Sequence, residues 1–243
     1  MSLSHLDGAF GWPATAVVAI LVAFLVLGGW LSRRRFAGLV RRIEREPGAL
    51  DGFYRRIIAT TWVLGLCVPL VLLIEPALTP ADVGLRWPAG DGIDYAVALF
   101  LLFVIVLGGL RRRRQIQGGR LVAGGQLLVL LPRTASQRRL AALLSVTAGV
   151  VEEAVFRGLF IAAGVGVLGL PLSVSALLSI ALFTWGHLYQ GFGGMLGAAV
   201  LGVLFTSLYI HLGEPAAARD PAHRPGSGGP AIDPTQRWRF GTG

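Results

Sequence analysis

Long apolar segments recur along this chain, and they limit its fold more than any other feature. They cover residues 13–31, 57–74, 95–110, 140–164, 171–187 and 192–211. A helix needs about 20 apolar residues to cross the hydrocarbon core of a bilayer. Only helices and closed barrels satisfy the backbone in lipid, and these segments are too long for barrel strands. The sequence therefore predicts an all-α, polytopic transmembrane helix bundle with about six spans.

The composition agrees with a membrane protein. Hydrophobic residues make up 54% of the chain and charged residues only 14%, which is too apolar for a soluble domain with a polar shell. Every basic residue is Arg, which indicates a GC-rich, bacterial genome. The formal charge of +9 is not accompanied by a nucleic-acid-binding motif. We therefore expect no nucleic-acid partner.

The positions of the Arg residues indicate how the chain is oriented. They gather between the first and second apolar segments and between the third and fourth. The connection 75–94 holds only Arg86, and residues 1–12 hold neither Lys nor Arg. Because cytoplasmic loops carry the excess of positive charge, the N-terminus is predicted to lie outside. The expected location is the cell (plasma) membrane, with a multi-pass topology.

The same pattern divides the chain into three regions. Residues 1–131 hold three N-terminal spans with basic cytoplasmic loops, and residues 132–213 hold the last three spans. Residues 214–243 are rich in Pro, Gly, Ala, Arg and Asp without an apolar period, and they are predicted to form a disordered tail. Cys67 is the only cysteine, so an intrachain disulfide and a Cys-rich metal site are excluded.

Two carboxylates and a guanidinium, Glu152, Glu153 and Arg157, lie well inside the fourth apolar segment. Ionisable groups at such a depth cost about 2.5–3.5 kcal/mol each on insertion scales, so they are candidate functional residues. Glu153 and Arg157 are four residues apart and share a helix face. One interpretation is a buried structural ion pair, with Glu152 facing water in a cavity. The other is a catalytic site.

His187 ends the fifth apolar segment. A histidine at a helix end more often has an interfacial or hydrogen-bonding role. Antiparallel packing of the fourth and fifth spans would bring it back toward Glu152, which lies deeper, about 12 residues into its helix. Contact requires that this helix start late, or that the loop at His187 dip into the membrane.

A carboxylate beside a neutral imidazole can activate water in two ways. It can act directly by general base catalysis, or through a bound divalent metal such as zinc. In the metal interpretation, Glu152 and His187 supply two ligands. Zinc prefers three protein ligands and a water, so this set is incomplete.

Together these motifs resemble the CPBP (CAAX protease, ABI) family of intramembrane endopeptidases. The motif Glu-Glu-x-x-x-Arg is matched by Glu152, Glu153 and Arg157, and the motif Phe-x-x-x-His is matched by Phe183 and His187. Each motif alone is weak, but together, in order and on successive apolar segments, they are quite specific. The resemblance covers about residues 132–213, roughly a third of the chain.

The resemblance implies a glutamate-dependent hydrolase with its active site inside the membrane. Such a hydrolase cuts peptides near a lipidated or membrane-embedded C-terminus. By position, Glu152 looks like the residue that activates water, and His187 looks like its partner or a metal ligand. Arg157 looks like a substrate or structural anchor, Glu153 supports the site, and Phe183 packs beneath it. The implied partners are the lipid bilayer and a membrane-associated peptide or protein substrate.

One part of the family pattern is not found. Family members continue into a further helix with His-x-x-x-Asn or His-x-x-x-Asp, which furnishes the remaining polar groups of the site. Here His211 lacks the required partner four residues later, and His223 lies in the Pro-rich tail. The sequence therefore predicts a truncated catalytic region, of the kind that a frameshift or a natural truncation produces.

Two functions from other classes stay open beside the endopeptidase. A catalytically inactive protein on the same scaffold could bind a peptide or protein partner, as a binding or immunity factor. The missing last helix favours that alternative. A small transporter or channel could use Glu152, Glu153 and Arg157 for ions or protons, but it leaves the second motif unexplained.

Overall fold

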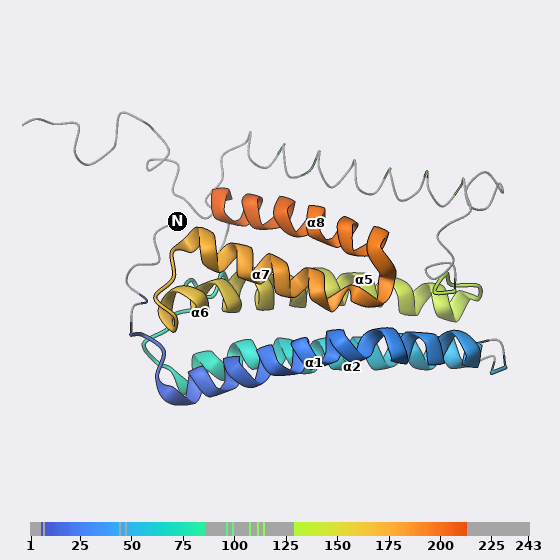
Figure 1. Ribbon diagram of the computed structural model, residues 1–243, viewed down its shortest axis with the longest axis horizontal. Coiled ribbons are helices and arrows are strands. Elements are labelled where there is room, and N and C mark those ends of the chain that lie inside the picture. Colours follow the sequence, from blue (N-terminus) through green and yellow to red (C-terminus); the bar gives the residue numbers. More distant parts are fainter. Residues whose placement is uncertain are drawn as a thin grey trace, which may run out of the picture.

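The described part of the chain is entirely helical. The computed structural model describes residues 6, 8–43, 45–46, 48–85 and 129–212, together with the isolated positions 96, 99, 107, 111 and 114. Within these residues no strand occurs, and the helices form an elongated bundle (Figure 1), which confirms the predicted fold class. The third predicted span and the predicted tail lie outside the described residues, apart from the isolated positions.

Two long helices form one side of the bundle. α1 spans Trp12–Ile43 and α2 spans Ala49–Ile74, and the two lie side by side. α1 continues past the predicted end at residue 31 and α2 begins before the predicted start at residue 57, because the helical backbone extends into the Arg-rich segments. Cations are favourable near the carbonyl end of a helix, and Arg41 and Arg42 occupy the last turn of α1.

The predicted fourth span is a continuous helical run of three pieces. These are α5 (Ala135–Glu152), the π-helix η2 (Glu153–Leu159) and α6 (Phe160–Gly166). A capping box between Thr134 and Gln137 starts the run. The Gln137 side-chain amide also donates to Asp51 Oδ1 at 2.9 Å. Because Asp51 lies in the first turn of α2, α2 and α5 begin at the same end and run parallel.

The last two helices are joined by a turn that lies partway along the bundle. α7 (Leu172–Gly186) and α8 (Gly191–Leu212) are connected by the short 3-10 helix η3 (Leu188–Gln190). Gly191 has a φ of 74°, a left-handed conformation that favours glycine at this chain reversal. α7 has only 15 residues, about 22 Å of helix, against a hydrocarbon core of about 30 Å. In Figure 1, α1, α2 and α5 extend beyond the turn.

The helices pack in layers, with α5, α6 and α7 between the α1/α2 pair and α8 (Figure 1). α7 contacts α1, α6 and α8, and α5 contacts α2. The N-terminal helices are therefore packed directly on the C-terminal ones, and side chains from both parts can line one site.

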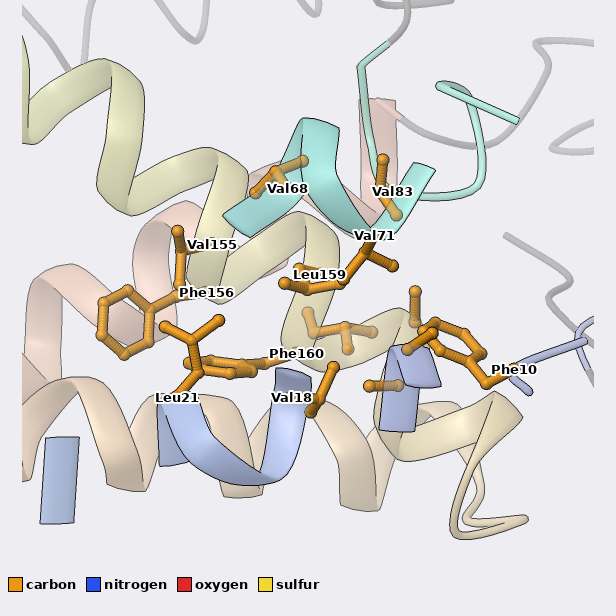
Figure 2. Close-up of a cluster of buried hydrophobic side chains, with 14 of the residues drawn as sticks. Phe10, Val18, Leu21, Val68, Val71, Val83, Val155, Phe156, Leu159 and Phe160 are labelled. Carbon is orange, nitrogen blue, oxygen red and sulfur yellow. The ribbon is translucent and has the colours of Figure 1, made fainter. Parts of the chain in front are cut away.

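A buried apolar cluster holds these layers together (Figure 2). It includes Val18 and Leu21 from α1, Val68 and Val71 from α2, Val83 from the following segment, and Val155, Phe156, Leu159 and Phe160 from the middle run. Other large apolar side chains point outward, for example Leu73, which is 80% exposed, and Phe192, which is 84% exposed. Among the described helices, α1, α2 and the η3–α8 unit are long and apolar enough to cross a membrane. This is the surface of a membrane protein, where lipid covers the outer apolar side chains.

Candidate active site

The two adjacent carboxylates lie where the middle helix changes from α to π geometry. Glu152 is the last residue of α5 and Glu153 is the first residue of η2. Single-turn π segments occur frequently at functional sites. Here the Phe156 carbonyl inside the π segment accepts a hydrogen bond from the Ser179 hydroxyl of α7. The sequence analysis missed this segment, because no local residue pattern distinguishes a π turn from an α turn.

Glu152 and His187 line the same partly open cavity, of about 120 Å³. Glu152 comes from the end of α5, and His187 is the residue that caps the C-terminus of α7. The other lining residues are Leu25, Thr61, Leu64, Val151, Val155, Phe156, Phe183 and Gly186. The structure therefore brings together the two residues to which the sequence analysis assigned water activation, in surroundings that are mostly apolar.

The short α7 explains how the two residues come to line one cavity. The sequence analysis left two ways, a late start of the helix that carries Glu152 or a loop that dips into the membrane. α5 starts at Ala135, before the predicted residue 140, so a late start is wrong. Instead, α7 ends after 15 residues, and His187 at its end lines the same cavity as Glu152.

A hydrogen bond to the backbone determines which ring nitrogen of His187 carries the proton. His187 Nδ1 lies 2.8 Å from the carbonyl oxygen of Phe183. A carbonyl oxygen only accepts, so Nδ1 carries the proton, and in a neutral imidazole Nε2 is then the acceptor. The His187 ring also packs against the Phe183 ring, with centroids 4.5 Å apart. The imidazole is thus held in one orientation, with a basic nitrogen left for a water.

Glu153 and Arg157 form an ion pair on a different part of the same run. Arg157 Nη1 lies 3.3 Å from Glu153 Oε1, and neither residue is among those that line the 120 Å³ cavity. The Arg157 side chain is only 2% exposed, whereas that of Glu153 is 41% exposed. Among the described residues, no acceptor lies in hydrogen-bonding geometry to the guanidinium nitrogens. The geometry matches the structural ion pair that the sequence analysis weighed as one interpretation.

Phe183 connects the ion pair to the cavity. The Arg157 guanidinium lies over its ring, with Cζ 4.6 Å from the centroid, and the ring of Phe205 lies on another side at 5.8 Å. The Phe183 ring also contacts Phe156 edge-on, at 5.2 Å between centroids. Cation–π contacts of this kind are strongest where the cation is desolvated. Arg157 therefore supports the residue whose carbonyl and ring orient His187.

A second, larger cavity of about 530 Å³ adjoins the first. Both cavities share Leu25, Leu64, Glu152 and Gly186. We call the larger one the α1/α2 groove, because most of its walls come from these helices. Its polar lining includes Arg35, Arg42 and Arg56. The sequence analysis assigned these residues only to membrane orientation, although Arg35 and Arg42 are seven apart and share a helix face.

Comparison with known proteins supports the peptidase interpretation for one part of the chain. The family model described as type II CAAX prenyl endopeptidase Rce1-like matches residues 134–218. This stretch is similar to that family, and we call it the Rce1-like region. No curated protein and no solved structure matches the chain. This match confirms the resemblance found in the sequence. The family is one of membrane endopeptidases of the CAAX-protease type.

The match begins at the capping residue of α5 and takes in every helix from α5 to α8. The Rce1-like region thus contains Glu152, Glu153, Arg157 and His187. α1 and α2 precede it, and so the groove that adjoins its cavity is built largely by residues outside the family match.

The Rce1-like region offers an incomplete set of metal ligands among the residues that the structure describes. Glu152 and His187 line one cavity, but within the described ranges no group of three His, Cys, Asp or Glu side chains could hold a metal ion. Zinc prefers three protein ligands. The described residues therefore do not fit a zinc site, and the chemistry considered below uses the carboxylate and the imidazole alone.

Proposed function

We propose that this protein is an intramembrane endopeptidase that hydrolyses peptide bonds of membrane-associated substrates. One observation carries the proposal: Glu152 and His187 line a single cavity inside a region that matches a membrane endopeptidase family. We place the protein in the cell membrane, with the Arg-rich ends of α1 and α2 on the cytoplasmic side.

In the proposed reaction Glu152 is the general base. Its carboxylate takes one proton from a water, and the resulting hydroxide forms a bond to the carbonyl carbon of the scissile peptide. His187 Nε2 accepts a hydrogen bond from the other proton of that water and holds the lone pair toward the carbonyl. When the carbon–nitrogen bond breaks, the proton on Glu152 passes to the leaving amine. Both carboxylate and imidazole return to their starting states.

The remaining site residues position these two. Arg157 holds Phe183 through the contact with its ring, and the Phe183 carbonyl accepts a hydrogen bond from His187 Nδ1. Glu153 pairs with Arg157 and offsets the charge of a cation that is almost fully buried. Loss of either residue would act on the chemistry through His187.

The decisive experiment is Glu152→Gln in purified protein with a quenched-fluorescence membrane peptide. This change keeps the volume and removes the base, so we expect a loss of cleavage by about 10²–10⁴-fold with unchanged thermal unfolding. The matched control is Glu75→Gln at the end of α2, where the amide oxygen can still accept from the Gly11 N–H. Cleavage by Glu152→Gln at the rate of the control would refute the proposed role.

A non-catalytic binding protein is the second candidate. A cavity with one carboxylate and one imidazole can also bind a peptide without cutting it, and an apolar groove adjoins this cavity. Fluorescence anisotropy on the same peptide separates the two functions. Saturable binding by the wild-type protein without any cleaved product would support the binding protein, and cleavage that depends on Glu152 would support the peptidase.

A further inference from the structure

The α1/α2 groove has an apolar body with opposite charges at its two ends. Its apolar lining includes Phe24, Leu25, Phe36, Leu39, Phe53, Ile57 and Leu64. Glu152 lies where the groove meets the smaller cavity, and among the groove residues it is the acidic one. Arg35, Arg42 and Arg56 lie toward the other end, at the C-terminal part of α1 and the N-terminal part of α2.

Two of the three arginines are available for a ligand. Arg42 makes a loose ion pair with Glu46, at 3.6 Å between Nε and Oε2. Within the part of the chain that the structure describes, Arg35 and Arg56 have no carboxylate partner. A guanidinium at the edge of an apolar groove favours a carboxylate, which it can bind through two parallel hydrogen bonds.

The rise of α1 and α2 gives the distance along the helix axes from Glu152 to these arginines. Leu25 and Leu64 line both cavities and so mark the level of Glu152. Arg35 is ten residues farther along α1, which is about 15 Å at 1.5 Å per residue. Arg56 is eight residues away along α2, which is about 12 Å. An extended peptide advances about 3.3 Å per residue, so this separation corresponds to about four to five residues.

We infer that the groove selects an extended, apolar substrate segment that carries a carboxylate about four to five residues from the scissile bond. The inference rests on the proposed function, because it takes Glu152 as the position of cleavage. The apolar walls contact the intervening side chains, and Arg35 and Arg56 bind the carboxylate. A peptide is favoured over a lipid as the occupant, because the groove is continuous with the cavity that holds the reacting residues.

The test uses a set of otherwise uncharged apolar peptides with one cleavage site and a single Asp, placed from one to ten residues away on either side. Cleavage is measured in a neutral detergent, so that no anionic lipid is present. We expect kcat/KM to peak, by about tenfold, for Asp at four to five residues. A peak at eight to ten residues, as for a helical segment, or no positional preference, would overturn the inference.

Charge reversal makes the test specific for the groove. Arg35→Glu and Arg56→Glu should each weaken the preference for Asp, and the two changes together should abolish it and create a preference for Lys at the same spacing. The matched controls are Arg33→Glu and Arg55→Glu, at neighbouring positions outside the groove lining, which should keep the Asp preference. If the variant with both changes still prefers Asp, the assignment of the arginines is wrong.

The outcomes for the two proposals are distinguishable. If wild-type protein cleaves none of the peptides, the endopeptidase itself is refuted. If the uncharged parent peptide is cleaved by the wild type and by both reversed variants at equal rates, but Asp has no positional effect, the endopeptidase stands and the substrate inference fails.

Discussion

The α1/α2 pair and the Rce1-like region contribute different kinds of residues to the candidate site. The Rce1-like region supplies Glu152 and His187, the proposed reacting groups, at the start of a π segment and at the end of a short α7. The α1/α2 pair, which precedes the family match, supplies most of the walls of the groove and all three of its arginines. Under the proposed function, the chemistry belongs to the Rce1-like region, whereas substrate access and selection depend on how α1 and α2 pack against it.

The largest effect that would sharpen this comparison is expected at His187. His187→Gln removes the basic nitrogen but keeps a side chain able to hydrogen-bond, so we expect kcat to fall by about 10²-fold or more at unchanged peptide binding. Single-turnover cleavage and anisotropy measure the two quantities. Tyr189→Phe, on the groove side of the same turn, is the comparison variant and should lose less. An equal loss in both variants would mean that the turn, and not the imidazole, is required.

The next effect concerns the contact between the segment after α2 and the π-helix. A Cβ at Gly158 would lie 2.1 Å from the backbone oxygen of Val83, which cannot move independently of its segment. We expect Gly158→Ala to lower the free energy of unfolding by about 1–3 kcal/mol, measured by thermal unfolding in detergent. Gly149→Ala is the control, because a Cβ there meets nothing within 4 Å. Equal stabilities would show that the two regions are not tightly joined here.

A smaller effect is expected where α1 meets the end of α7. The Trp185 indole donates to the Val26 carbonyl at 2.9 Å, and a Cβ at Gly29 would lie 2.4 Å from the indole ring. Because Trp185 is two residues from His187, Gly29→Ala should lower cleavage several-fold by displacing the turn. The control is Gly52→Ala, at a position outside both cavities where an added Cβ meets nothing within 4 Å, and it should behave as wild type. Unchanged cleavage by Gly29→Ala would break the link between α1 and the reacting pair.

The smallest effect is expected within the Rce1-like region itself. Ser179→Ala removes the hydroxyl that donates to the Phe156 carbonyl of the π segment, and it should cost about 1–2 kcal/mol of stability. Ser145→Ala is the matched control, since its hydroxyl bonds only within α5 and is exposed. If only α1 and α2 stabilised the π segment, Ser179→Ala and Ser145→Ala would have the same free energy of unfolding.

Much of the fold was predictable because its signals are local in the sequence. Apolar segments marked the spans, and four of the six predicted spans coincide with α1, α2, α7 and α8, while a fifth coincides with the run from α5 to α6. Helix ends were less predictable. α1 continues through Arg33, Arg34 and Arg35, because long Arg side chains extend to solvent and leave the backbone helical.

The candidate site was predictable in its residues and not in its geometry. Glu152 was singled out because a carboxylate is costly inside an apolar span, and His187 because antiparallel packing would bring it toward Glu152 and because it completes the Phe-x-x-x-His motif. Their meeting depends on the length of α7 and on the level at which η3 reverses the chain, which the apolar composition did not reveal. The ion pair of Glu153 and Arg157 followed from four-residue spacing alone, but the placement of Phe183 between Arg157 and His187 did not.

The sequence by itself determined that this chain is a helical membrane protein, which residues carry charge within its spans, and which family residues 132–213 resemble. Each of these depends on residue type and spacing along one helix. Only the tertiary structure decided that Glu152 and His187 share a cavity, and that arginines of α1 and α2 lie along a groove leading to it. Those relations join residues far apart in the chain, and they are fixed by how close-packed helices of unequal length fit against one another.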